Sequence, residues 1–341
     1  MILGCGVPGG ERTVHEITQP VNCEDVANPE LKKYTLVMMK YIHMTGFVVF
    51  FTIFTSIASA KDFDRGVAFY KNGNFSAAMD EWRPLAAQGH ARAQFNLGVM
   101  YAKGIGVLKD EAYALHWYRL AADQGRADAQ NNLGLMYAKG QGVLRDTAEA
   151  MRWYRLAADQ GSADAQNNIG NMYYRGDGVL KNWNKADPWF RLAAEQGHAG
   201  AQNNLGVVYT LGRDLFDWPE AVHWFRLAAE QGLAVAQYNL GSMYAKGMGV
   251  ERDLAEAMHW YHLAAEQGFA KAQYVLGSYY DHGELKNVVV AHMWYNIADK
   301  NGFEGAGKRR DDLEAEMTPE QIATAVQRAK TCMSSNHAQC D

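Results

Sequence analysis

The chain has 341 residues, of which 48% are hydrophobic and 21% are charged, and its formal net charge at pH 7 is −5. This composition is typical of an ordinary soluble protein, and it excludes an intrinsically disordered chain and a protein that crosses a membrane many times. The mildly acidic balance argues against nucleic acid as a partner, because binding to phosphates needs a basic surface.

The amino-terminal part of the chain carries the pattern of a secretory signal. A short basic segment begins at Met38, an apolar run covers residues 47–57, and Ala58-Ser59-Ala60 is an AxA cleavage motif. The run is shorter than the roughly 20 residues that a transmembrane helix needs. We therefore expect a signal peptide over residues 38–60, cleavage between Ala60 and Lys61, and no stable membrane anchor afterwards.

Residues 1–37 show no periodicity and precede this signal. Because a secretory signal normally begins a chain, we expect these residues to be an untranslated upstream extension or a disordered segment, with translation starting at Met38 or Met39. The alternative is a cytoplasmic tail on an uncleaved signal anchor.

From residue 62 onward the chain repeats a unit of about 36 residues. The stretch from Ala127 to Gly161 reads ADAQNNLGLMYAKGQGVLRDTAEAMRWYRLAADQG, and similar copies end at Gly125, Gly197, Gly232, Gly268 and, more loosely, Gly302. A divergent pair over residues 62–89 precedes the full copies. We expect it to be an amino-terminal cap, since the terminal units of a repeat array expose one side to water.

Each copy is predicted to contain two short helices. The first should end at Gly140, which can adopt the left-handed conformation, and the second should begin after an N-cap at Asp146 and end at Gly161. The GQGV segment between them is a tight turn. It is not a phosphate-binding loop, because no strand precedes it and no Lys-Ser/Thr step follows.

A single unit is too small to bury its apolar face, so the copies must stack into an all-α solenoid. Alanines at Ala157 and Ala158 and a glycine at Gly134 allow neighbouring helices to approach closely. Tryptophans that we place at one shared position of the second helix are expected to fill the core: Trp82, Trp117, Trp153, Trp189, Trp224, Trp260 and Trp294. The rival interpretation is an exposed aromatic ladder for stacking on sugars or bases.

The repeated segments AQNNLG, MYAKGQGV, EAMRWY and AADQG, with the acidic residue Asp146 at the helix start, resemble the Sel-one-like repeat family. This family is a branch of the tetratricopeptide-like α/α repeats, so the resemblance implies a right-handed superhelix. We expect the solenoid to cover residues 61–302, with about six full repeats after the divergent pair.

After Gly302 the repeat stops, and residues 303–341 are expected to form a carboxyl-terminal helical cap. Thr318, Pro319 and Gln321 have the spacing of a capped helix start. An oxidising compartment would allow Cys332 and Cys340 to form a disulfide that holds down the terminus.

Two further features concern the second helices and their turns. Arginines on these helices stand four residues before an acidic residue, which predicts solvated pairs within each helix: Arg119 with Asp123, Arg155 with Asp159, Arg191 with Glu195, and Arg226 with Glu230. Trp183 and Trp218 lie in unusual turns of neighbouring repeats. Packing of each over its own turn is the favoured interpretation, and an exposed partner-binding patch is the alternative.

A row of asparagines on the first helices is the candidate partner-binding site: Asn96, Asn132, Asn168, Asn204 and Asn239. In tetratricopeptide relatives this position faces the concave groove, which implies hydrogen bonds to a bound peptide backbone. The alternative is that the amides bond within the stack. Lys139, Arg175 and Lys246 lie near the row and could orient an acidic ligand.

Catalytic signals are weak throughout the repeats. His259 and His262 are three residues apart, but no HExxH, CxxC, GxSxG or SxxK motif accompanies them. We expect no metal and no cofactor. The predicted function is an exported, non-catalytic scaffold that binds a protein or peptide through a concave groove, in the cell envelope or outside the cell. The alternative is a periplasmic hydrolase acting on a β-lactam or cell-wall substrate, as suggested by cysteine-rich members of the family.

Overall fold

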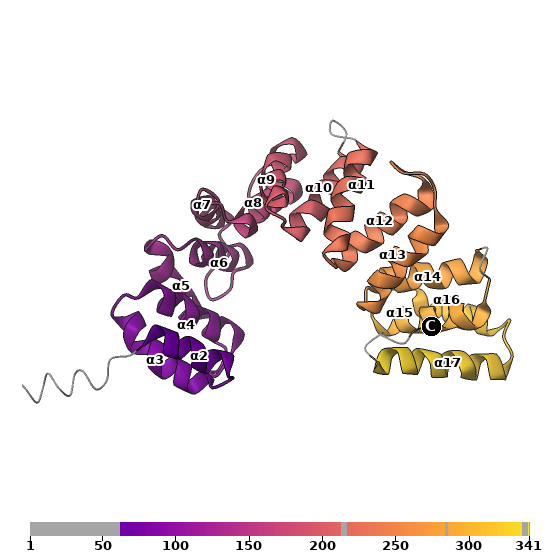
Figure 1. Ribbon diagram of the computed structural model, residues 1–341, viewed down its shortest axis with the longest axis horizontal. Helices are drawn as coiled ribbons and strands as arrows, with labels where there is room; N and C mark the ends of the chain where they lie inside the picture. Colours follow the sequence, from indigo (N-terminus) through magenta and orange to yellow (C-terminus); the bar gives the residue numbers. More distant parts are fainter. Residues whose placement is uncertain (1–61, 213–216, 284–285, 336–339, 341) are drawn as a thin grey trace, which may run out of the picture. The chain divides into compact units, whose positions relative to one another are not determined.

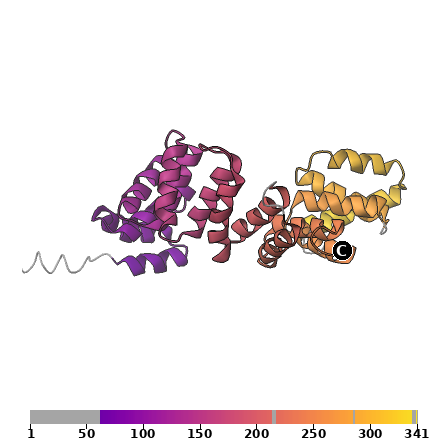
Figure 2. The same cartoon turned by 90° about the horizontal axis from the view of Figure 1, so that it is seen from above.

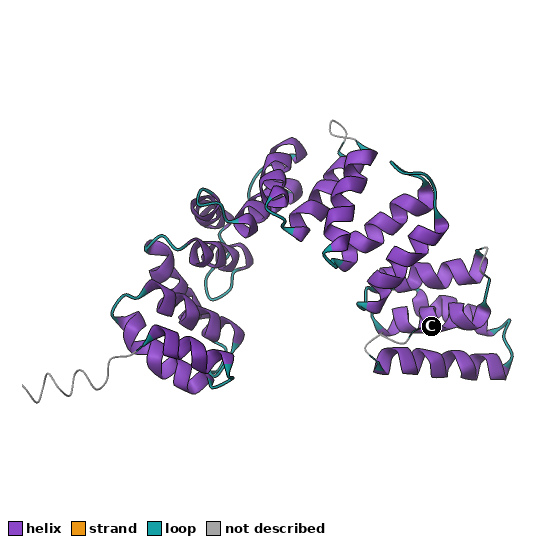
Figure 3. Ribbon diagram, in the orientation of Figure 1, coloured by secondary structure: helices purple, strands orange, loops and turns teal. Residues whose placement is uncertain are grey.

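The computed structural model describes residues 62–212, 217–283, 286–335 and 340 (Figure 1). The predictions for residues 1–37, for the signal peptide and for cleavage between Ala60 and Lys61 lie outside the described residues. Every regular element in the described ranges is a helix (Figure 3). None of these helices is both long and apolar enough to cross a membrane.

The helices are short and nearly uniform in length, as the repeat predicts. Their bounds are α2 (Phe63–Lys71), α3 (Phe75–Ala87), α4 (Ala91–Lys103), α5 (Glu111–Asp123), α6 (Ala127–Lys139), α7 (Thr147–Ala158), α8 (Ala163–Arg175), α9 (Trp183–Glu195), α10 (Ala199–Leu211), α11 (Trp218–Glu230), α12 (Ala234–Lys246), α13 (Leu254–Glu266), α14 (Ala270–His282), α15 (Val288–Lys300), α16 (Ala306–Glu314) and α17 (Pro319–Ser334).

Consecutive helices from α2 to α15 pack on one another, so the helix pairs stack in chain order (Figure 1). The pair α2/α3 begins the stack, and the six pairs from α4/α5 to α14/α15 continue it. The fold is therefore an all-α solenoid, which confirms the predicted fold class.

The helix ends follow the predicted signals. Gly140 ends α6 with φ 69°, and the Asp146 carboxylate accepts hydrogen bonds from the backbone N–H groups of Ala148 and Glu149, both at 3.0 Å. At the start of α17, the Thr318 hydroxyl accepts from the Gln321 N–H at 3.3 Å, and the Gln321 side chain accepts from the Thr318 N–H at 2.9 Å. Because these caps satisfy backbone groups locally, each helix length is encoded in its own repeat.

The close approach between the two helices of a repeat depends on glycine, but the aromatic partner is not the predicted tryptophan. A Cβ on Gly134 would lie 2.7 Å from the Tyr154 ring, and a Cβ on Gly170 would lie 2.5 Å from the Phe190 ring. The aromatic residue directly after each tryptophan therefore fills this contact. A helix turns by about 100° per residue, so the tryptophan side chain points about 100° away from the aromatic side chain that contacts the glycine.

The prediction of seven equivalent core tryptophans is accordingly wrong in part. Trp82 stands one position further along its helix than the others and occupies the place of Tyr118 and Tyr154, with its ring against Gly66. Trp153, Trp224 and Trp294 are buried as expected. The rest of the row is only half-buried: Trp117, Trp189 and Trp260.

Helices α16 and α17 both pack on α15 at the carboxyl end of the stack (Figure 2). The predicted disulfide between Cys332 and Cys340 is present, and both cysteines are buried. Ala329 and Cys332 of α17 join the same apolar cluster as Met293 and Trp294 of α15. This packing places α17 over the last repeat, as expected of a cap.

Candidate partner-binding face

The first helices of the repeats (α4, α6, α8, α10, α12 and α14) form the surface that carries the asparagine row, which we call the first-helix face. Beneath it runs a ladder of glutamines that the sequence analysis did not single out. The buried Gln130 donates to the Ala122 carbonyl of the preceding repeat at 3.1 Å, and its Oε1 accepts from Gln160 of its own repeat at 2.7 Å. Gln237 makes the same two bonds with Ala229 and Gln267.

This glutamine ladder extends along the whole stack. The acceptor glutamines are Gln94, Gln130, Gln166, Gln202, Gln237 and Gln273. The recurring AQ and QG dipeptides are the sequence signal that could have revealed it, because a polar residue repeated at a core position needs a repeated partner. The ladder fixes the register between repeats without using any atom of the asparagine row.

Some amide groups of the asparagine row form hydrogen bonds between repeats. Asn168 donates to Asn131 at 2.9 Å, Asn204 donates to Asn167 at 3.0 Å, and each acceptor belongs to the preceding repeat. Asn239 continues the pattern by donating to Asn203 at 2.9 Å. These bonds are the ones that the alternative interpretation of the row expects.

The other two asparagines lack this bond because the preceding repeat has no asparagine to accept it. In the repeat before Asn132, Phe95 occupies the position of the acceptor asparagine. Asn132 instead hydrogen-bonds the Tyr118 hydroxyl. Asn96 makes no hydrogen bond within the described ranges. In Asn168, Asn204 and Asn239 the Oδ1 acceptor has no partner among the described groups, so it remains available to a donor from outside.

The predicted arginine pairs within the second helices are not formed. Each arginine instead donates to a tyrosine hydroxyl of the following repeat, as Arg119 does to Tyr137 and Arg226 does to Tyr244 at 2.6 Å. Arg155 and Arg191 make the same contact, with Tyr173 and Tyr209. The arginines are therefore part of the contact between repeats.

The three predicted basic residues are the last residues of their helices. Lys139 ends α6, Arg175 ends α8 and Lys246 ends α12, and all three are exposed. None forms an ion pair within the part of the chain that the structure describes. Each is followed by a glycine in the left-handed conformation, which turns the chain away and leaves the cation at the edge of the face.

Two hollows lie on the first-helix face, and each contains one member of the asparagine row. The amino-terminal hollow, of about 620 Å³, includes Asn132, Arg126, Asp128 and Asp164. The Arg126 guanidinium of this hollow is already paired, because its Nε donates to Asp128 Oδ1 at 3.0 Å. Asp164 lies 3.2 Å from His198 Nε2. The hollow therefore presents two carboxylates and one arginine that is already paired.

The carboxyl-terminal hollow, of about 320 Å³, is walled mainly by apolar side chains of α10, α11 and α12 and of the turn after α12. The apolar residues and one threonine of this wall are Val207, Thr210, Leu211, Phe225, Met243 and Met248. Leu211 is 56% exposed, whereas Met243 is almost completely buried. The hollow thus offers an apolar surface that solvent reaches at its rim.

The polar residues of the carboxyl-terminal hollow are Tyr238, Asn239, Ser242, Lys246 and Lys271. Lys271 Nζ lies 4.9 Å from the centre of the Tyr238 ring, a cation–π contact. The Ser242 hydroxyl donates to the Tyr238 carbonyl at 3.0 Å and accepts from Tyr261 at 3.2 Å. No acidic residue is among its described lining residues, so the hollow has two cations and no carboxylate.

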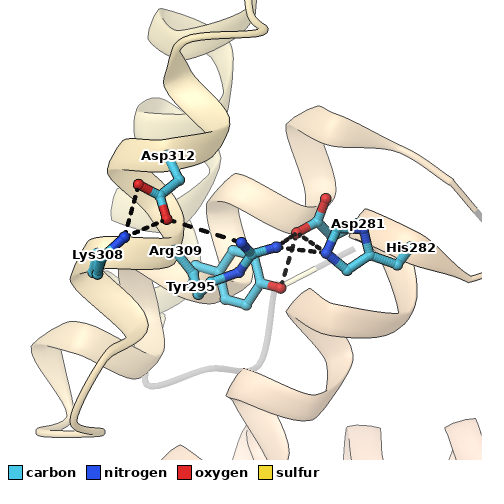
Figure 4. Close-up of polar contacts among 6 residues, drawn as sticks. All are labelled: Asp281, His282, Tyr295, Lys308, Arg309 and Asp312. Carbon is cyan, nitrogen blue, oxygen red and sulfur yellow. Dashed lines mark hydrogen bonds and ion pairs between the residues drawn. The ribbon is translucent and has the colours of Figure 1, made fainter.

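A separate polar cluster joins the last repeat to the cap (Figure 4). The buried Asp281 of α14 accepts from the Tyr295 hydroxyl of α15 at 3.1 Å and from Arg309 of α16 at 2.8 Å, while His282 Nε2 lies 3.1 Å from the same carboxylate. Burial, with the nearby Asp281 charge, raises the pKa of Tyr295 to about 12. Because Tyr295, Arg309 and His282 surround the same carboxylate, the cluster has a structural role.

The remaining sequence candidates are placed as follows. Trp183 stacks on Tyr174 of the same repeat, with ring centres 5.8 Å apart, and Trp218 packs against the core of α10 and α11. His259 and His262 do not join a metal-binding group. In the described residues, no three His, Cys, Asp or Glu side chains gather in a way that could hold a metal ion.

Comparisons with known proteins agree with this architecture. The model of the Sel1 repeat matches residues 91–125, 127–162, 163–198, 199–233, 234–269 and 270–303. No match to the chain was found among curated proteins.

The solved structures that are similar to the chain include the following two. A Sel1 repeat protein from Oxalobacter formigenes is 37% identical with a TM-score of 0.65, over 70% of this chain and 97% of that protein. A protective antigen present in uropathogenic Escherichia coli strains, which displays an SLR fold, is 31% identical with a TM-score of 0.63. That match covers 82% of this chain and 65% of the antigen, so the chain spans less than two thirds of the antigen's length.

Proposed function

Because the chain belongs to the Sel1 repeat family, whose stacked helix pairs serve protein interactions, we propose that it is an exported, non-catalytic scaffold that binds a protein or peptide partner. The binding surface in this proposal is the first-helix face. The partner meets the chain in the cell envelope or outside the cell.

The observation that carries the proposal is that some polar groups on this face bond between repeats while others do not. The glutamine ladder and the donor groups of Asn168, Asn204 and Asn239 hold the repeats together. The acceptor oxygens of the same asparagines, and the cations at the helix ends, have no hydrogen-bond or ion-pair partner among the residues that the structure describes. Groups of this kind are what an extended peptide backbone with acidic side chains would contact.

Three features support export. The AxA motif ending at Ala60 fits a signal peptidase site, and the Cys332–Cys340 disulfide fits an oxidising compartment. The similar uropathogenic Escherichia coli protein is a protective antigen, a description that suits a protein met outside the cytoplasm.

Crosslinking in the native host tests the scaffold proposal. A photoreactive residue at the exposed Lys246 should capture a defined envelope protein, whereas the same residue at the exposed Lys308 of the cap should not. Equal capture from both sites would contradict binding through the first-helix face. Turnover of a β-lactam or peptidoglycan by the purified chain would contradict the non-catalytic part.

Intact mass of the protein from its native host tests export. The proposal expects a mature chain that begins at Lys61, with no free thiol at Cys332 or Cys340 under denaturing conditions. A chain that retains residues 1–60, or two reactive thiols, would contradict it.

A further inference from the structure

The carboxyl-terminal hollow is small and apolar, which limits what it can hold. Its volume of about 320 Å³ lies at the lower end of the range for binding pockets, which is roughly 300–1,000 Å³. A hollow of this size takes one large side chain and not the surface of a folded domain. Leu211 and Met248 lie at its wall, so an apolar side chain entering it would leave water.

Among the described residues that line the hollow, both charged side chains are cations. Lys246 ends α12, and Lys271 is the second residue of α14 in the next repeat, so two successive repeats contribute one cation each. Neither lysine forms an ion pair with a described residue, and Lys271 contacts only the Tyr238 ring. In the amino-terminal hollow, by contrast, the one arginine already binds Asp128.

The lining of the hollow also includes a hydrogen-bond acceptor, the Oδ1 of Asn239. The Asn239 amide group is held by its bond to Asn203, which fixes the orientation of the side chain. Its Oδ1 is then directed away from that bond and has no described partner. A backbone N–H of a bound segment is the donor that suits it.

Resting on the proposed function, we propose that the carboxyl-terminal hollow binds an extended segment of the partner protein in which a large apolar side chain stands next to a carboxylate. The Leu, Met or Phe side chain of the segment enters between Leu211 and Met248. The adjacent Asp or Glu lies between Lys246 and Lys271, and the segment's backbone donates to Asn239.

The test is selection of random linear peptides displayed on phage against the immobilised full chain. We expect the enriched peptides to carry Asp or Glu beside Leu, Met or Phe. A synthetic, fluorescein-labelled copy of an enriched peptide should bind at least tenfold more weakly to the variant Lys246→Ala/Lys271→Ala. The matched variant Lys300→Ala/Lys330→Ala removes two exposed cations outside the first-helix face, one from α15 and one from α17, and should change the Kd less than twofold.

Since all four residues are exposed, the variants should unfold at the same midpoint as the parent chain. Enriched peptides without acidic residues, or with unchanged affinity for Lys246→Ala/Lys271→Ala, would overturn this inference while supporting peptide binding. No enrichment at all would also overturn it. The scaffold proposal is judged separately by the envelope crosslinking, which does not require a linear peptide.

Discussion

The amino-terminal and carboxyl-terminal hollows are built on equivalent helices but differ in the chemistry that they present. Asn132 of α6 and Asn239 of α12 stand at the same position of their repeats, as do Lys139 and Lys246. The positions of Arg126 and Asp128 in the earlier repeat are taken by Leu233 and Val235 in the later one. The later repeat thus has apolar residues in place of the ion pair, and the carboxyl-terminal hollow is lined by residues further along α12, such as Met243 and Lys246.

This difference shows how a repeat protein separates folding from recognition. The buried glutamines and the glycine–aromatic contacts are the same beneath both hollows, as in Gln130 and Gln237 or Gly134 and Gly241. Substitutions of first-helix-face residues that make no hydrogen bond between repeats should therefore alter ligand binding without altering the stack. If this account is right, matched substitutions beneath the two hollows cost the same, and matched substitutions on the face do not act alike.

The largest expected effect is removal of a buried tryptophan. Trp153 and Trp224 are both buried, and each indole donates to a glutamate one turn earlier, Glu149 at 3.1 Å and Glu220 at 2.9 Å. Replacing either by Ala should cost about 3–5 kcal/mol of unfolding free energy through the cavity left behind. Urea denaturation measures it.

The half-buried Trp117 provides the control for this pair, and its replacement by Ala should cost clearly less. If Trp153→Ala and Trp224→Ala differed by more than about 2 kcal/mol, the shared core beneath the two hollows would not be equivalent.

The glutamine ladder predicts a smaller but equal loss. Gln130→Ala and Gln237→Ala each remove two hydrogen bonds of a buried amide, one to an alanine carbonyl and one from a neighbouring glutamine, which should cost about 1–3 kcal/mol. The exposed Gln327 of α17 is the control, and Gln327→Ala should leave the unfolding free energy unchanged. An unchanged unfolding free energy for Gln130→Ala or Gln237→Ala would show that water replaces the hydrogen bonds of the ladder.

High pH should destabilise the fold through its buried tyrosines. Burial raises the pKa of Tyr118 and of Tyr295 to about 12, so the folded chain keeps these phenols neutral while the unfolded chain ionises near pH 10. Their contribution is complete below pH 10 and is lost as the pH rises to 12, by up to about 1.4 kcal/mol per pH unit for each group. Urea denaturation from pH 9 to 12 should show a shallower fall for Tyr295→Phe, and an unchanged slope would contradict this assignment.

The smallest expected effect separates the two kinds of asparagine in the row. Asn168→Ala removes a donor that Asn131 accepts, and should cost about 0.5–1.5 kcal/mol. Asn96→Ala removes no described hydrogen bond and should leave the unfolding midpoint in place. Equal destabilisation by both substitutions would mean that the hydrogen bonds between repeats are not what the asparagines contribute.

Most of the fold could be predicted from the sequence because each repeat encodes its own helix ends. Gly140, Asp146 and Thr318 act locally, and internal repetition shows which positions recur. The cross-repeat partners could not be predicted in the same way. Arg119 donates to Tyr137 of the next repeat. This contact depends on the rotation between the two repeats, and the sequence of one repeat does not specify that rotation.

The hollows were beyond prediction for the same reason. Lys271 lies at the carboxyl-terminal hollow, beside the Tyr238 ring, only because of how successive repeats stack, and a single repeat does not contain that information. Asp281 and Arg309 are 28 residues apart, and Arg309 lies after the last repeat, so the repeat pattern does not indicate their ion pair. The asparagine row was identified as a row, but its donors could not be assigned to the stack.

The separation of folding from recognition is tested most directly by measuring stability and peptide affinity together in two variants. Lys246→Ala/Lys271→Ala should weaken binding of the selected peptide at least tenfold while leaving the unfolding free energy unchanged. Gln237→Ala should lower the unfolding free energy by about 1–3 kcal/mol while leaving the Kd per folded molecule unchanged. If the lysine variant lost stability in proportion to its loss of affinity, or if Gln237→Ala weakened binding in the folded chain, the face and the stack would not be separable and the account would be wrong.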